Sequence, residues 1–165
     1  MDKLSYGFFF SASLDKYLMS LIHPVSPAHI TDTFGTHSEQ RKAMGLVPYR
    51  GLDYAVPVGT PLKAVGRGTI VRIYESKILG HVVELRTMVT FEARQIVRIF
   101  AYCHLDKAEV KVGQKVQQGD IIAHSGNSGT SSGPHLHLMA GITENLMTMP
   151  VENPLRWLPK VPGKE

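Results

Sequence analysis

Glycine and proline interrupt this chain too often for long helices to form over most of its length. Between residues 49 and 142 they recur every few positions and leave only short segments between them. Those segments are β-branched or alternate between apolar and polar residues, as strands do: Thr69–Tyr74, His81–Arg86, Gln95–Tyr102, Asp120–His124 and His135–Ala140. Short strands joined by tight turns predict an all-β fold, an antiparallel sandwich or a partly open barrel.

Two parts of this region resemble each other. Val58–Leu62 leads through Gly66 into one predicted strand, and Val112–Val116 leads through Gly119 into another. This suggests an internal duplication. Similar hairpins occur in biotinyl and lipoyl carrier domains, but those carry a modifiable lysine at a hairpin tip. Because no lysine here has that setting, a carrier function is disfavoured.

The composition of the 165 residues, 43% hydrophobic and 19% charged, is typical of one globular domain. A net charge of +4 favours an anionic partner but is too scattered to indicate nucleic acid. We expect no membrane span, because no apolar run approaches about 18 residues. A single cysteine excludes an intramolecular disulfide.

Prolines near the N-terminus suggest where the main domain begins. Pro24 and Pro27 interrupt regular structure, so the sequence predicts an N-terminal extension over 1–27, a domain over 28–160 and a tail over 161–165. The apolar stretch at residues 6–10 is short and is soon followed by charged residues, so it is not a convincing signal peptide.

Histidine is unusually frequent, with eight residues, and two of them stand at i and i+2 in Gly133-Pro134-His135-Leu136-His137. On a strand these two imidazoles project from the same face, and Leu136 points to the other. Two imidazoles on one face can address one metal ion, or one can bind metal while the other acts on a substrate.

Two further segments carry candidate residues. By the same alternation Tyr102 and His104 share a face and Cys103 points away, so Cys103 and His104 cannot act as a nucleophile–base pair without a bulge. Cys103 is expected to be a small buried residue. Asp53 is either a turn residue or a carboxylate metal ligand, and catalytic zinc takes about three nitrogen or oxygen ligands from the protein.

Taken together, these segments resemble the lysostaphin/LytM-type zinc metallopeptidases, which cut peptide bonds in bacterial peptidoglycan. The family pattern is His-x-x-x-Asp, then a strand ending in His-Leu, then Gly-Pro-His-x-His. Here those become Tyr49-x-x-x-Asp53, His104-Leu105 and Gly133-Pro134-His135-Leu136-His137. The resemblance runs from about residue 30 to 158 and implies a LytM-like fold of the duplicated hybrid type.

Carried over residue by residue, the resemblance implies a Zn²⁺ site with Asp53 and His137 as ligands. It implies that His104 and His135 form the catalytic pair. Zinc would polarise the scissile carbonyl and acidify its bound water, and histidine titrates where a general base must.

Tyr49 stands where the family has its first histidine ligand, and three outcomes stay open. Tyr49 can bind the metal as phenolate, which would neutralise Zn²⁺ together with Asp53 and weaken it as a Lewis acid. Another histidine, His37 or His124, can replace it. Alternatively the chain binds zinc poorly and is a non-catalytic module that binds peptidoglycan or activates a partner.

We therefore expect a zinc-dependent endopeptidase whose partner is a peptidoglycan peptide, with a binding module as the alternative. Its site of action would be extracellular or periplasmic. A bacteriophage tail or lysis protein would reach that substrate without a signal peptide, so virion association with phage tail proteins as partners is a further expectation.

Overall fold

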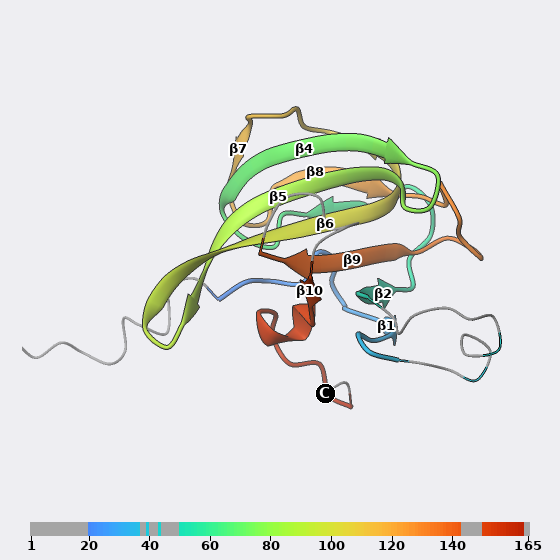
Figure 1. Ribbon diagram of the computed structural model, residues 1–165. Helices are drawn as coiled ribbons and strands as arrows, with labels where there is room; N and C mark the ends of the chain where they lie inside the picture. The colour runs from blue at the N-terminus through green and yellow to red at the C-terminus, as the bar shows by residue number, and fades with distance from the viewer. Residues whose placement is uncertain (1–19, 37–38, 40–42, 44–49, 143–149, 164–165) are drawn as a thin grey trace, which may run out of the picture.

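The computed structural model describes residues 20–36, 39, 43, 50–142 and 150–163. Within them the regular structure is almost entirely β (Figure 1). The elements are β1 (Ile30–Asp32), β2 (Leu52–Tyr54), β3 (Pro61–Lys63), β4 (Gly68–Ser76), β5 (Gly80–Phe91), β6 (Arg94–Ala108), β7 (Lys115–Val116), β8 (Ile121–Ser125), β9 (Leu136–Gly141), β10 (Val151–Glu152) and the short 3₁₀ helix η1 (Pro154–Arg156).

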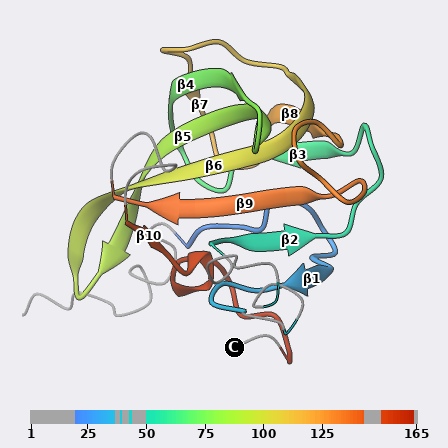
Figure 2. The same cartoon turned by 45° about the vertical axis from the view of Figure 1, so that its right-hand side comes forward.

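All strand pairs in the described chain are antiparallel and belong to one branched sheet in the order β1-β2-β9-β6-β5-β4-β7. The long strand β6 is the junction, because its middle residues, Ile99 to Cys103, pair with β9 and its last residues, Leu105 to Ala108, pair with β8. β8 also pairs with β3, which curls the sheet over itself (Figure 2). The predicted all-β, antiparallel, partly open fold is confirmed.

The suggested duplication corresponds to reciprocal strand pairing. β3 of the first copy pairs with β8 of the second, and β7 of the second pairs with β4 of the first. Backbone hydrogen bonds repeat in the same way: the Gly59 and Gly113 N–H groups donate to Ser125 and Ile70 carbonyls, both over 2.8 Å. The two glycines have φ of 84° and 85°, a conformation that suits glycine at both turns.

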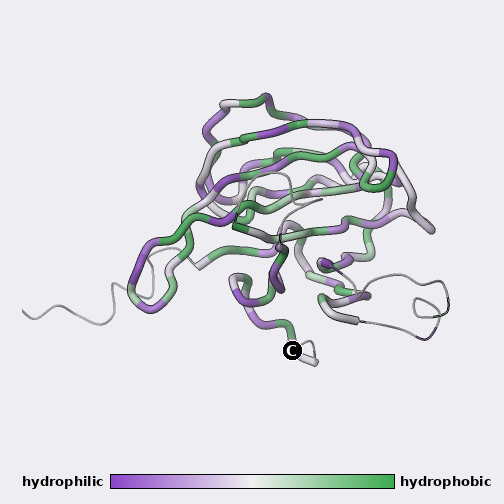
Figure 3. The backbone as a smooth tube through the Cα atoms, in the orientation of Figure 1, coloured by the Kyte–Doolittle hydropathy of each residue, from purple (hydrophilic) through white to green (hydrophobic). Residues whose placement is uncertain are grey.

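Alternation along the strands buries one sheet face in a large hydrophobic core, which includes Leu52, Tyr54, Tyr102, Leu136 and Leu138. Figure 3 shows hydrophobic and hydrophilic stretches alternating along β4, β5 and β6. A smaller cluster lies on the other face: Leu79, Val82, Ile99, Ala101, Cys103 and Met139. The candidate site residue His137 lies on that second face, because it is the register partner of Cys103.

Residues 20–27 pack as part of this domain. Leu21 and Val25 belong to the large core, and the Lys63 N–H donates to the Pro24 carbonyl over 2.8 Å. His23 lies 2.9 Å from the Tyr54 hydroxyl through Nδ1 and 2.9 Å from the Pro159 carbonyl through Nε2. The segment assigned to the extension therefore contributes to the core; residues 1–19 lie outside the described residues.

Among the described residues, no helix is long and apolar enough to cross a membrane.

β5 and β6 form a long hairpin that extends beyond the neighbouring strands (Figure 1). Its two-residue turn places Glu92 at φ 48° and Ala93 at φ 59°. Two positive φ angles define a type I′ turn, which favours Asn-Gly, so this turn is strained by its side chains.

The double substitution Glu92→Asn and Ala93→Gly should therefore stabilise the protein. Relief of the left-handed strain outweighs the extra unfolded-state entropy of glycine by about 0.5–1 kcal/mol, which raises the Tm by about 2 °C. Thermal unfolding followed by circular dichroism measures it. Ala55→Gly is the control. Ala55 is exposed and its φ is not positive, so glycine there only adds unfolded-state entropy and should lower the Tm. A lower Tm for the double variant would contradict the strained-turn interpretation.

Candidate active site

Asp53 and His137 face each other across the β2–β9 pair. They are direct register partners, so their side chains project from the same sheet face. The His137 Nδ1 lies 3.0 Å from the Asp53 Oδ1, and the side chains are only 7% and 17% exposed. A carboxylate and an imidazole thus converge at the edge of the second sheet face.

This pair suits a metal ion. Two ligand atoms on tetrahedral zinc are about 3.3–3.6 Å apart, given bonds of about 2.0–2.2 Å, and the 3.0 Å between His137 Nδ1 and Asp53 Oδ1 is only slightly shorter. No group of three His, Cys, Asp or Glu side chains within the described ranges is placed to hold a metal. Asp53 and His137 could therefore supply two donors to a metal ion, which would need at least one more from elsewhere in the chain.

Gly51 makes room for this pair. A Cβ atom at Gly51 would lie 2.5 Å from the Leu138 carbonyl oxygen and 2.6 Å from the His137 Cε1. The backbone before β2 therefore runs directly against the His137 ring, and only glycine fits there. Sequence reasoning did not identify this residue, although it lies within the Tyr49-x-x-x-Asp53 pattern.

His135 joins the site just before β9. Its Nε2 lies 3.6 Å from the Asp53 Oδ1, as expected from the i, i+2 relation to His137. Its Nδ1–H donates to the Gly133 carbonyl over 2.8 Å, and the Ser131 hydroxyl lies 3.2 Å away. Because a carbonyl only accepts, this bond places the ring proton on Nδ1 and leaves Nε2 as the basic nitrogen.

His104 reaches the same site through a β-bulge. The β5–β6 register shifts between His81–Leu105 and Val83–Tyr102, so two β6 residues, Cys103 and His104, oppose one on β5. His104 has φ 60°. Its ring centroid lies 4.7 Å from that of His135 and 6.0 Å from that of His137.

The bulge corrects the predicted alternation at this point. Tyr102 lies in the large core, and Cys103 is the register partner of His137 on the other face. His104 does not return to the Tyr102 face, because the extra residue turns its side chain toward the imidazoles. The predicted shared face of Tyr102 and His104 was therefore wrong. His104 nevertheless lies beside His135 and His137.

Cys103 is not a nucleophile in this arrangement. Its thiol is fully buried, and burial, together with the nearby Glu84 and Asp53 carboxylates, raises its pKa. A thiol with a raised pKa is protonated and inert near neutral pH. The predicted role as a small buried residue is confirmed.

Burial lowers the pKa of His104, which the hydrogen bond to Ser128 partly counteracts. The His104 Nδ1–H donates to the Ser128 backbone carbonyl over 2.8 Å, so Nε2 is left as the basic nitrogen. A neutral imidazole with a fixed basic nitrogen is the form that accepts a proton in catalysis.

The Ser128 side chain holds that carbonyl in place. Its Oγ accepts the His81 N–H over 3.0 Å and donates to the Leu105 carbonyl over 2.7 Å. The loop packs so closely that a Cβ at Gly80 would lie 2.2 Å from the Ser128 Oγ. The segment after β8 therefore acts as a rigid support for the His104 ring, a backbone role that the sequence pattern could not reveal.

Ser128→Ala is expected to lower kcat about 10-fold with little change in KM or bound metal, because the His104 tautomer loses its support. ¹⁵N NMR of the imidazole should show His104 moving from one tautomer to a mixture. Thr130→Ala is the matched control, since the Thr130 Oγ1 donates to the Lys77 carbonyl in the same loop. Equal losses in both variants would mean that the loop merely contributes to stability.

The remaining candidates for the metal set fall in two groups. Tyr49 and His37 lie outside the described residues, so their roles stay predictions. His124 lies on β8, where its Nδ1 is 3.2 Å from the exposed Glu109 carboxylate. It forms no metal-binding group with Asp53 and His137 in the described part of the chain.

A carboxylate and three imidazoles gathered on one face of an antiparallel sheet is an arrangement typical of metal-dependent hydrolases. The model of peptidase family M23 matches residues 47–148, a range that contains Asp53, His104, His135 and His137. The chain belongs to peptidase family M23. This confirms the resemblance read from the three motifs.

Relatives and solved structures agree with this family. The chain is 39% identical over 90 residues to the peptidoglycan DD-endopeptidase ShyA of Vibrio cholerae, covering 54% of this chain and 20% of ShyA. It is 38% identical over 87 residues to lysostaphin of Staphylococcus simulans, covering 53% of this chain and 17% of lysostaphin. The chain thus spans about one fifth of the length of these curated relatives.

Among solved structures, the catalytic domain of lysostaphin from Staphylococcus simulans is similar with TM-score 0.63 and 28% identity. The match covers 78% of this chain and 90% of that domain. A point-mutant catalytic domain of the prophage-encoded M23 protein EnpA from Enterococcus faecalis also matches with TM-score 0.63 and 28% identity, over 82% of this chain and 95% of that one.

Proposed function

We propose that this protein is a zinc-dependent endopeptidase that hydrolyses peptide bonds in peptidoglycan cross-links. The observation that carries the proposal is the convergence of two side-chain pairs: Asp53 with His137, 3.0 Å apart, and His104 with His135, whose ring centroids are 4.7 Å apart. Membership of peptidase family M23 and the similarity to ShyA, a peptidoglycan DD-endopeptidase, support the substrate class.

In this proposal Asp53, His137 and Tyr49 hold the metal. A bound zinc ion would supply Lewis-acid polarisation of the scissile carbonyl and a lowered pKa for water. His104 and His135 lie beside that pair, each with its Nδ1–H donated to a backbone carbonyl. One Nε2 is therefore placed to take a proton from the attacking water, and the imidazolium N–H formed in this way can donate to the carbonyl oxygen on which charge develops.

Tyr49 makes a distinct chemical difference. A phenolate and a carboxylate together carry two negative charges, so a Tyr49–Asp53–His137 set would neutralise Zn²⁺ and make it a weaker Lewis acid than a set with a neutral imidazole. We therefore propose a slower enzyme than one with histidine at residue 49. The substitution Tyr49→His should raise activity.

Metal content and cleavage of purified peptidoglycan test the proposal together. The protein is dialysed with zinc, analysed for bound metal and incubated with purified sacculi, and the released muropeptides are identified by mass spectrometry. We expect about one zinc per chain and new amino termini at the cross-links. Zinc at far below one equivalent, with no cleavage by either wild type or Tyr49→His, would reject the enzyme.

A non-catalytic module is the alternative that Tyr49 itself motivates. It would bind sacculi without releasing muropeptides, and Tyr49→His would then restore metal binding without restoring cleavage. Co-sedimentation with sacculi alongside the cleavage assay separates the two functions.

The proposed substrate requires a site of action outside the cytoplasmic membrane, in the periplasm or beyond the cell. Attachment to a phage particle is one route to it, and the phage tail partners expected from the sequence are proposed on that basis alone. Co-purification of the chain with intact virions would test this part.

A further inference from the structure

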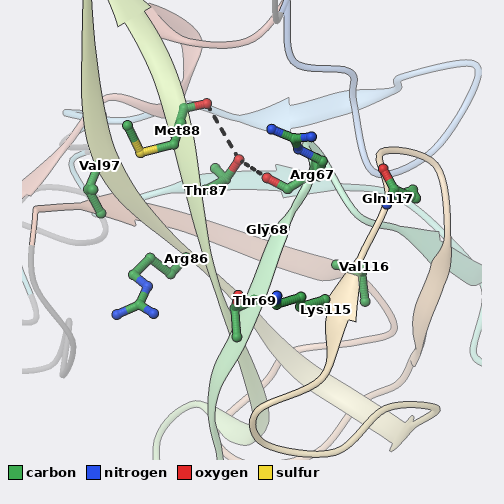
Figure 4. Close-up of a pocket in the computed structure, with 10 residues that line it drawn as sticks. All are labelled: Arg67, Gly68, Thr69, Arg86, Thr87, Met88, Val97, Lys115, Val116 and Gln117. Atoms are coloured by element: carbon green, nitrogen blue, oxygen red, sulfur yellow. Dashed lines mark hydrogen bonds between the residues drawn. The ribbon is translucent and has the colours of Figure 1, made fainter.

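A recess of about 410 Å³ lies where β7, β4, β5 and β6 run side by side, and no histidine lines it (Figure 4). Three cationic residues line it: Arg67, Arg86 and Lys115. We call these three residues with their recess the cationic pocket. Met88 and Val97 add an apolar wall on one side.

Strand register explains why these side chains meet. Thr69 on β4 is the partner of both Arg86 on β5 and Lys115 on β7, so the three share a sheet face. Met88 is the partner of Val97 and follows Arg86 by two positions, which puts this pair on the same face. The pocket is thus built from four strands that are far apart in the sequence.

No acidic residue lining the cationic pocket balances its positive charge. All its lining residues are described, and none is Asp or Glu. Arg67, Arg86 and Lys115 form no ion pair in the described part of the chain. Like charges that share a recess repel one another, and a bound oxyanion would relieve that repulsion while accepting guanidinium hydrogen bonds.

The backbone beneath the pocket is held firmly. The buried Thr87 hydroxyl donates to the Arg67 carbonyl over 2.7 Å, and a Cβ at Gly68 would lie 2.1 Å from the Arg86 carbonyl oxygen. The strands that carry Arg67 and Arg86 are therefore locked together at close range. The cationic side chains themselves are exposed, so an oxyanion can reach them from solvent while the backbone that carries the two arginines stays in place.

The pocket and the proposed active site lie on the same sheet face. Val97, Ile99, Ala101 and Cys103 alternate along β6 on that face, and Cys103 is the register partner of His137. Cys103 follows Val97 by six positions along the strand, about 20 Å at about 3.3 Å per residue. Ile99 and Ala101 between them are buried, so the two are separate sites that one extended polymer could reach.

We propose that the cationic pocket binds an oxyanion, carboxylate or phosphate, carried by the cell-wall polymer whose cross-link lies at the histidine site. The proposal rests on the proposed function for the identity of the polymer. The pocket is an anchoring site that holds the polymer while the cleavable bond reaches Asp53 and His137. It contributes affinity for the polymer and no chemistry to the cleavage.

Binding to insoluble peptidoglycan in the presence of a chelator tests the pocket without cleavage. The double variant Arg86→Ala/Lys115→Ala is compared with Arg94→Ala/Lys111→Ala, which removes the same charge from exposed residues outside the pocket. We expect the pocket variant to bind at least about 10-fold more weakly and the matched variant to bind within about 2-fold of wild type. Equal weakening in both variants, or no binding by wild type, would overturn the proposal.

Two arms distinguish the source of the oxyanion. Peptidoglycan stripped of phosphodiester polymers with hydrofluoric acid retains only the carboxylates of the peptides, and inorganic phosphate serves as a soluble competitor. Pocket-dependent binding that survives stripping identifies carboxylate, and binding that is lost identifies phosphate; either supports the pocket.

Cleavage of a short soluble cross-linked muropeptide separates this proposal from the proposed function. The pocket variant should cleave it as wild type does, while its digestion of whole sacculi slows. A wild-type chain that cleaves nothing but binds sacculi through the pocket would reject the enzyme and keep the pocket. Equal loss of short-peptide cleavage would place Arg86 and Lys115 in the active site instead and reject the anchoring role.

Discussion

Gly51→Ala is expected to remove metal binding and to lower activity at least about 100-fold. The added methyl group would lie 2.6 Å from the His137 Cε1 and 2.5 Å from the Leu138 carbonyl oxygen, so either the ring or the strand must shift. A shift of the ring separates His137 Nδ1 from Asp53 Oδ1, the two atoms proposed to bind the metal. Elemental analysis after dialysis and the sacculus assay measure the two losses.

The same change should cost about 1–3 kcal/mol of folding free energy, because overpacking against backbone is relieved only by distortion. Thermal unfolding of the metal-free protein measures this cost, so the prediction can be checked whether or not zinc binds. Gly133→Ala is the matched control, since a Cβ there meets no atom within 4 Å. Similar losses in both variants would show that the close contact with His137 is not the cause.

His104→Ala is expected to lower kcat about 10²–10⁴-fold while leaving zinc content unchanged. His104 lies beside the proposed metal ligand His137, with the two ring centroids 6.0 Å apart. It is held in place by the Ser128 carbonyl. Removing it takes away a proton acceptor without removing a ligand. Steady-state kinetics on a soluble muropeptide, with metal analysis of the same sample, test both parts.

His81→Ala controls for the loss of an imidazole on a neighbouring strand, because the His81 side chain is half exposed. It should retain wild-type kcat. The variants His104→Ala and His135→Ala should not be additive if the two rings act on one proton transfer. A His104→Ala protein that lost its zinc would instead identify His104 as a metal ligand.

Local pattern predicted β4, β5, β6, β8 and β9, but not the shorter strands, and it predicted one half of the candidate site. The five strand segments and the shared face of His135 and His137 follow from alternation and from Gly-Pro punctuation, which depend only on neighbours in the chain. The Asp53–His137 contact follows from register, which no single segment encodes. It became predictable only through the family resemblance.

The features that the sequence did not predict have identifiable physical reasons. Alternation placed His104 on the same face as Tyr102, but the bulge that redirects its side chain depends on the pairing of β6 with β5. A glycine at this position would have indicated a bulge, whereas a histidine with φ 60° gives no such signal in the sequence. The support from Ser128 comes from a backbone carbonyl, which every residue has. The cationic pocket joins four strands, so no window of the sequence contains it.

Because the duplicated segments pair reciprocally, two fragments of the chain are expected to reassemble into the same fold. A break in the turn at Glu92–Ala93 would leave β3 and β4 on one fragment and their partners β8 and β7 on the other. Neither fragment completes its own sheet, and Asp53 would be parted from all three site imidazoles. The two halves would complement each other, and the site would form only when they assemble.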